Sequence, residues 1–206
     1  MKPVKIIAAI LILALVFCSL PTAALAEEST SEETEWYKVD MSAWNYNEEA
    51  DVYWQTGIAY CSDPADAEYE NLGIFVPGAY FDASDNGDGT YTCSVNSEGE
   101  SQGYTAETAP VVIPVNTPGY SAMSAPTGYT SEAGEYASQG FIYVSAGCRG
   151  RDSGAPAGVT DLKAAIRFIR ANADILPGDC ESIFSFGMSG GGAQRTPRSY
   201  RRQCTL

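Results

Sequence analysis

The chain has 206 residues, with 26 acidic and 12 basic side chains, no histidine and a formal net charge of −14 at pH 7. So acidic a surface argues against nucleic acid and anionic membranes as partners of the mature chain. Without histidine, and with cysteine spacings that fit no zinc pattern, the sequence indicates no metal site and calls for no cofactor.

Residues 1–26 have the pattern of a secretory signal peptide. Lys2 and Lys5 precede an apolar run over residues 6–17, and small residues form a cleavage site that ends at Ala26. We therefore predict cleavage after Ala26 and a secreted, extracellular protein without a membrane segment in its mature form. An uncleaved anchor is the less favoured alternative, because the apolar run is too short to cross a bilayer comfortably.

The mature chain begins with an acidic leader. Residues 27–35 are rich in Glu, Ser and Thr and carry too little apolar surface to offset the entropy of ordering, so we predict that they are disordered. Residues 36–194 have the length and the apolar content for one domain.

Five segments of this domain are typical of strands, since they are rich in β-branched and aromatic residues and bounded by turn residues. They cover residues 52–61, 71–81, 108–116, 141–147 and 182–186. Between the last two, residues 160–174 have apolar side chains at helical spacing, with Thr160 as a candidate N-cap and Arg170 near the negative end. Strand, helix and strand in this order predict an α/β fold with a mostly parallel sheet and flanking helices.

Residues 81–95 contain Asn-Gly and Asp-Gly steps, which mark the tight turn of a hairpin. The stretch also resembles a calcium loop. With Asp82 at position 1, however, Cys93 falls at position 12, where a bidentate acid is needed, so we favour the hairpin.

The chemistry of the chain centres on Ser189. The stretch from Gly187 to Gly191 fits the pattern G-x-S-x-G, and a predicted strand runs directly into it. A nucleophile elbow needs small residues on both sides of a strained serine, which Gly187, Gly190 and Gly191 provide. A plain Gly-rich turn and a phosphate-binding loop are the alternatives, but the sequence lacks the Lys-Ser/Thr pair of a P-loop.

The chain resembles the α/β-hydrolase superfamily, and within it the bacterial tannase and feruloyl-esterase branch. The resemblance covers roughly residues 50–194. It is carried by Ile74 to Tyr80, Asn116 to Tyr120, Gly147, Arg149 to Asp152, Ala155 to Gly158, Asp161 to Arg167 and Gly187 to Gln194.

The resemblance implies a carboxylic ester hydrolase in which Ser189 attacks the ester carbonyl. The backbone N–H groups of Gly190 and of the loop near Gly119 would hold the oxyanion. Small phenolic esters such as gallates or ferulates would be the substrates, beside aromatic walls to which Tyr80, Tyr120 and Tyr129 are candidates. Core packing explains most tyrosines equally well.

Two arginines follow the strand at residues 141–147. Arg149 and Arg151 can pair with Asp152 or Asp161 and brace this loop, which we favour over contact with substrate.

The end of the chain departs from the family pattern. In this fold the acid and the histidine of the triad follow the serine, and the chain contains no histidine. Residues 195–206 carry four arginines and Pro197, whereas a helix packed on the sheet should be apolar. A frameshift after Gln194 accounts for both features, so we expect an inactive, aggregation-prone N-terminal portion of a hydrolase, truncated after the elbow.

Two further functions remain open, a non-catalytic secreted binding module on a hydrolase scaffold and a serine peptidase of the same fold. The disulfide pattern is open as well. Four mature cysteines allow three pairings among Cys61, Cys93, Cys148 and Cys180, and the sequence favours none of them.

Overall fold

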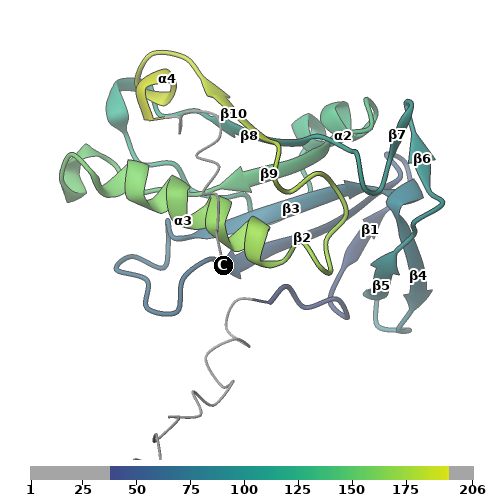
Figure 1. Ribbon diagram of the computed structural model, residues 1–206. Coiled ribbons are helices and arrows are strands. Elements are labelled where there is room, and N and C mark those ends of the chain that lie inside the picture. Colours follow the sequence, from purple (N-terminus) through teal and green to yellow (C-terminus); the bar gives the residue numbers. More distant parts are fainter. Residues whose placement is uncertain (1–37, 195–206) are drawn as a thin grey trace, which may run out of the picture. The chain divides into compact units, whose positions relative to one another are not determined.

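A six-stranded sheet organises the part of the chain that the computed structural model describes, residues 38–194 (Figure 1). Its strand order is β1-β2-β3-β9-β8-β10. The strands are β1 (Asn45–Asn47), β2 (Val52–Ala59), β3 (Asn71–Pro77), β8 (Val111–Val115), β9 (Ile142–Ala146) and β10 (Ile183–Gly187). The predicted signal peptide, the predicted leader and the predicted C-terminal tail, residues 195–206, lie outside the described residues.

The sheet is mixed, so the prediction of a mostly parallel sheet is wrong for this part of the chain. Only β8 pairs in parallel, with β9 and with β10. The pairs β1–β2, β2–β3 and β3–β9 are antiparallel. The physical reason is the connections: β1, β2 and β3 follow one another without a crossover helix, and a parallel pair requires such a crossover.

Helices cover both faces of the sheet, as an α/β arrangement requires. The helix α3 (Ala157–Ala171) packs Leu162, Phe168 and Ile169 into the larger core on one face. The short helix α2 (Ser131–Ala137) packs on Phe75 and Tyr143 on the other face. Figure 1 shows α3 crossing the sheet, with α2 near β8 and β9. The strands β8 and β9 are accordingly buried along almost their whole length, as their apolar sequences predicted.

The predicted helix at residues 160–174 is α3, but it begins earlier than expected. Pro156 is its N-cap residue, and Thr160 lies inside the first turn, where its hydroxyl donates to the Pro156 carbonyl at 2.9 Å. The prediction of Thr160 as the cap is therefore wrong. Arg170 lies in the last turn, as predicted.

The hairpin at residues 81–95 is confirmed, with β4 (Phe81–Asp85) antiparallel to β5 (Tyr91–Val95). A second small hairpin joins β6 (Glu100–Ser101) and β7 (Tyr104–Thr105). Between residues 38 and 194 no group of three or more Cys, Asp or Glu side chains is placed to hold a metal ion. Within the same range, no helix is long and apolar enough to cross a membrane.

The four cysteines of the described chain are free thiols. Burial raises the pKa of Cys93 to about 12 and the pKa values of Cys148 and Cys180 to about 11. Burial also raises the pKa of the partly exposed Cys61. These thiols therefore stay protonated and weakly nucleophilic near neutral pH.

Candidate active site

Three loops meet where the parallel strands end. Because β10 pairs in parallel with β8, Gly187 lies opposite Val115, and the residues after both strands emerge at the same edge. The loop after β9 joins them through two backbone hydrogen bonds between Met123 and Cys148, of 2.9 and 2.7 Å. Ligands of open α/β sheets bind beyond these carboxyl ends, and Ser189 lies there.

Ser189 occupies the turn between β10 and the helix α4 (Gly190–Gln194). Its φ angle is 52°, in the left-handed region that residues with a side chain rarely adopt. The serine is nonetheless exposed. A strained, exposed serine between a strand and a helix is the geometry of a nucleophile elbow.

The glycines around Ser189 are required by close approach of the backbone. A Cβ atom on Gly187 or Gly191 would collide with the carbonyl oxygen of Val115. A Cβ on Gly190 would collide with the carbonyl oxygen of Thr117 and lie 2.7 Å from the Tyr120 nitrogen. Only glycine at these positions lets the elbow pack directly against the end of β8.

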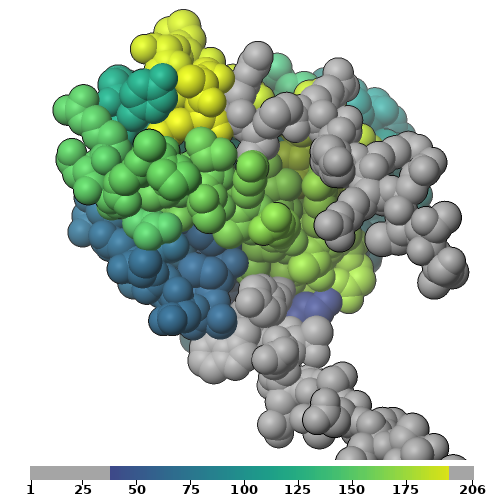
Figure 2. Space-filling view, turned by 60° about the vertical axis from the view of Figure 1, so that its left-hand side comes forward, coloured from purple at the N-terminus to yellow at the C-terminus, as the bar shows by residue number. Residues whose placement is uncertain are grey.

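The loop after β8 places Gly119 beside the elbow. The loop forms the short 3-10 helix η4 (Pro118–Tyr120), in which Gly119 and Tyr120 have φ angles of 60° and 62°. The Gly119 nitrogen lies 3.3 Å from the point where a Gly190 Cβ would be. Within residues 38–194, neither the Gly119 N–H nor the Gly190 N–H donates a hydrogen bond to another protein atom. In Figure 2 the yellow segment after β10 lies beside teal and green segments of the chain.

A buried hydrogen bond joins the loop after β8 to the helix α4. The Thr117 hydroxyl donates to the Gln194 side-chain oxygen at 2.8 Å, and both residues are almost fully buried. Neither residue has a role in the predictions from the sequence. Their positions in the sequence could have indicated a role at the site, since Thr117 follows a predicted buried strand and Gln194 follows the glycines of the elbow.

The loop after β9 is fixed by a buried ion pair. Arg149 donates to both carboxylate oxygens of Asp161, from Nε at 3.0 Å and from Nη2 at 2.7 Å. The Arg149 backbone N–H also donates to Asp161, and Glu70 lies 3.4 Å away on the other side. Hydrogen bonding to Asp161 raises the pKa of Arg149 above its usual value. The predicted pairing of Arg149 with Asp161 is confirmed.

Arg151 behaves differently from Arg149. Its guanidinium lies 3.9 Å from Asp152, and both side chains are largely exposed, so this pair contributes little to stability. Its Nη1 atom donates to the carbonyl oxygen of Gly119 at 3.3 Å. Arg151 thus supports the Gly119 loop from the solvent side.

Of the three candidate tyrosines, one lies at the elbow. Tyr120 follows Gly119 directly and is 46% exposed. Tyr80 is fully buried, and its hydroxyl donates to the Gly140 carbonyl at 2.8 Å, so it is a core residue. Tyr129 packs against α2, where its hydroxyl occupies the space beside Gly134.

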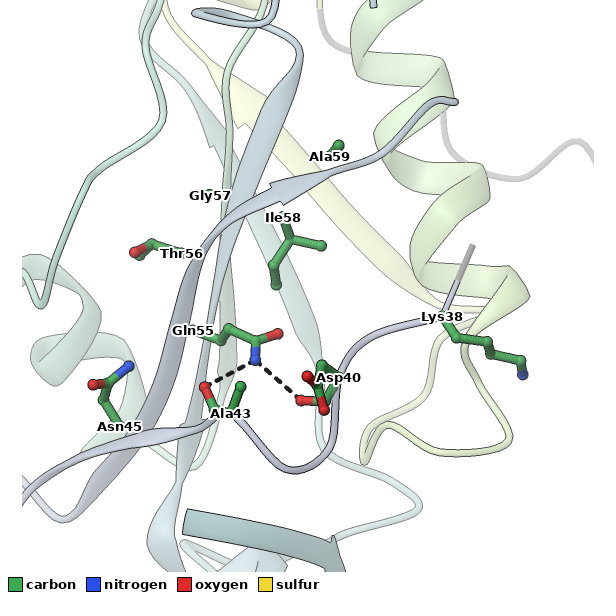
Figure 3. Close-up of a pocket in the computed structure, with 9 residues that line it drawn as sticks. All are labelled: Lys38, Asp40, Ala43, Asn45, Gln55, Thr56, Gly57, Ile58 and Ala59. Atoms are coloured by element: carbon green, nitrogen blue, oxygen red, sulfur yellow. Dashed lines mark hydrogen bonds between the residues drawn. The ribbon is translucent and has the colours of Figure 1, made fainter. Parts of the chain in front are cut away.

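One hollow of the described chain is distant in sequence from this site. It has a volume of about 650 Å³ and runs along the second half of β2 and the segment that precedes β1. Figure 3 shows Gln55 pointing to the backbone of this segment, where its amide donates to the carbonyls of Asp40 and Ala43. Ser189 and the residues around it do not line this hollow.

Comparison with known proteins identifies relatives of the chain. The BD-FAE family model matches residues 101–195. Tannin acyl hydrolase from Lactobacillus plantarum is 32% identical over 69% of this chain and 31% of its own, with a TM-score of 0.56. Fusobacterium nucleatum tannase is also 32% identical over 69% of this chain and 30% of its own, with a TM-score of 0.54.

A further structure of tannase from Lactobacillus plantarum covers 80% of this chain and 36% of its own at 26% identity, with a TM-score of 0.60. The chain thus spans about a third of the length of these relatives. No curated protein matches the sequence.

Proposed function

Because the chain belongs to the tannase and feruloyl-esterase-like hydrolase family over the part that it shares with these proteins, we propose that it carries the nucleophile of a serine-type carboxylic ester hydrolase. The mixed sheet would be the N-terminal part of an α/β-hydrolase sheet. The observation that carries the proposal is the exposed Ser189 at a φ angle of 52°, with Gly190 packed against the Gly119 loop.

The proposed step is acyl transfer to Ser189. Its hydroxyl oxygen attacks the ester carbonyl carbon, and the electron pair of the carbonyl double bond moves to oxygen. The N–H groups of Gly190 and Gly119 stabilise this negative charge, which is larger in the transition state than in the substrate. A base takes the proton of the serine hydroxyl and passes it to the leaving oxygen, so the alcohol leaves as the carbonyl re-forms and an acyl-enzyme remains.

The histidine of the family's catalytic triad is not in the chain. A serine hydroxyl is a weak nucleophile until a base removes its proton, and none of the 206 residues is histidine. We infer that a histidine from outside this sequence completes the triad and that the chain by itself does not turn over esters.

The proposed substrates are small phenolic esters. Tannin acyl hydrolase structures have been determined in complex with ethyl gallate and with 3,4-dihydroxybenzoate. In this chain the exposed ring of Tyr120 beside the elbow is the aromatic surface on which such an acyl group would stack.

A thiol in place of Ser189 tests the proposal without a base. At a pH near its ordinary pKa of about 8.5, half of a thiol is thiolate and reacts directly. We expect the thiolate of Ser189→Cys to be acylated rapidly by p-nitrophenyl acetate, with release of p-nitrophenolate as the sulfur–carbon bond forms. Alkylation by iodoacetamide, which displaces iodide and creates no oxyanion, measures the accessibility of the same thiolate.

The matched control is Ser153→Cys. Ser153 is an exposed serine on the 3-10 helix η5 (Arg151–Ser153). We expect the ratio of the acylation rate to the alkylation rate to be about a hundredfold higher at position 189, as for an oxyanion-hole donor. The unsubstituted chain gives the background of the native thiols. Equal ratios at positions 189 and 153 would leave Ser189 as part of a Gly-rich turn and would favour the non-catalytic binding module.

We also propose that the protein is secreted after cleavage behind Ala26. The lysines and the apolar run at the N-terminus support this proposal. N-terminal sequencing of the protein recovered from the medium of an expressing bacterium should begin at Glu27. Retention of Met1 in a membrane fraction would instead indicate an uncleaved anchor.

A further inference from the structure

We propose that Thr117 and Gln194 form a clamp that positions the two oxyanion donors relative to each other. The inference rests on the proposed function of Ser189, Gly119 and Gly190. Thr117 and Gln194 touch neither the substrate nor the reacting atoms, so both are positioning residues.

The need for a clamp follows from the origin of the two donors. Gly190 begins the helix α4, whereas Gly119 lies in η4, after a different strand. Two N–H groups stabilise one oxyanion only if both point to the same place, and a misplacement of about 1 Å can cost a hundredfold in rate. Whatever fixes η4 against α4 therefore sets the strength of the oxyanion hole.

The Thr117–Gln194 hydrogen bond is the direct polar link between these two elements in the described chain. It joins the residue that precedes η4 to the last residue of α4, and the two partners are 77 positions apart in sequence. Thr117 is 0% exposed and Gln194 4%, so water does not compete for the bond.

Both partners are held in place by their surroundings. The Thr117 carbonyl accepts from the Tyr120 N–H at 3.0 Å, which closes the turn that contains Gly119. The carbonyl also lies against Gly190 so closely that a Cβ there would collide with it. On the other side, a Cβ on Gly158 of α3 would lie 3.0 Å from the Gln194 amide nitrogen, which leaves the Gln194 side chain little room to turn away.

The test compares acylation and alkylation of the Ser189→Cys chain with and without the clamp. Thr117→Val removes the hydroxyl at nearly constant volume. We expect it to slow acylation by p-nitrophenyl acetate by about ten- to a hundredfold. Alkylation by iodoacetamide should stay within about twofold, because that reaction uses no oxyanion donor. Thr117→Ser, which keeps the hydroxyl, should restore acylation.

The matched control is Thr130→Val. Thr130 caps α2, where its hydroxyl accepts from the Ala133 N–H at 3.3 Å, and α2 packs on Phe75 and Tyr143 of the sheet. This variant should leave both rates unchanged. If Thr117→Val does not fold, Gln194→Met removes the acceptor of the same hydrogen bond and is expected to give the same selective loss.

Three results would overturn the clamp. They are unchanged acylation in Thr117→Val, an equal loss of acylation and alkylation, and a Thr117→Ser variant as slow as Thr117→Val. Failure of the proposed function is distinguishable from these, since Ser189→Cys with an intact clamp would then show no higher ratio of acylation to alkylation than Ser153→Cys.

Discussion

Replacing Arg149 with methionine should lower the free energy of unfolding by about 3 kcal/mol or more. Methionine fills much of the volume but leaves the carboxylates of Asp161 and Glu70 without their cation. Their side chains are 1% and 8% exposed. Removing one partner of a buried ion pair is costly because the other charge stays buried and unpaired.

Urea unfolding of the 206-residue chain measures this effect, and Arg151→Met is the matched control. Arg151 is the same residue type two positions along the chain, but its side chain is 70% exposed and its ion pair with Asp152 is long. We expect a change of about 0.5 kcal/mol or less in the control. Equal losses in the two variants would show that the Arg149 pair does not brace the loop.

Replacing Gly190 with alanine should disable the elbow. The new Cβ would collide with the Thr117 carbonyl and lie 2.7 Å from the Tyr120 nitrogen, and these backbone atoms can give way only if the loop moves. We expect a loss of about 1–3 kcal/mol in stability from overpacking. In the Ser189→Cys chain, acylation should also fall by about a hundredfold as Gly119 is displaced.

The control for this variant is Gly128→Ala. No heavy atom lies within 4 Å of a Cβ at Gly128, and its φ angle is not in the left-handed region. Unfolding and acylation should therefore stay close to those of the parent chain. If Gly190→Ala were as stable and as reactive as Gly128→Ala, the close packing of the elbow against the Gly119 loop would be refuted.

Local patterns in the sequence predicted the elements that local forces determine. The strand before Ser189, the glycines around it and the hairpin at residues 81–95 follow from apolar runs, tight turns and backbone strain within a few residues. The same holds for the body of α3, whose apolar face has helical spacing. Its start was misjudged because Thr160 and Pro156 both suit the first turn of a helix.

Features that depend on contacts between residues far apart in the sequence could not be predicted from local patterns. The sheet is mixed because of how β1, β2 and β3 connect, which the apolar content of single strands does not reveal. The helix α2 was missed because it has only seven residues in a stretch rich in turn formers, although Thr130 and Glu132 are typical of a helix start. The contact of Thr117 with Gln194 depends on the tertiary fold itself.

The proposed oxyanion donors are present in a chain that has no histidine. The donors that would stabilise an oxyanion come from Gly119 and Gly190, which both lie within the described residues. Deacylation, in contrast, needs a base to activate water. An acyl group on Ser189→Cys should therefore persist long enough to be observed.

The most direct test of Ser189 as the nucleophile of an ester hydrolase is a crystal structure of this acylated Ser189→Cys chain. We predict that the acyl carbonyl oxygen lies about 2.7–3.1 Å from the nitrogens of both Gly190 and Gly119. An acyl oxygen that points into solvent, with neither nitrogen within hydrogen-bonding distance, would contradict the proposed site.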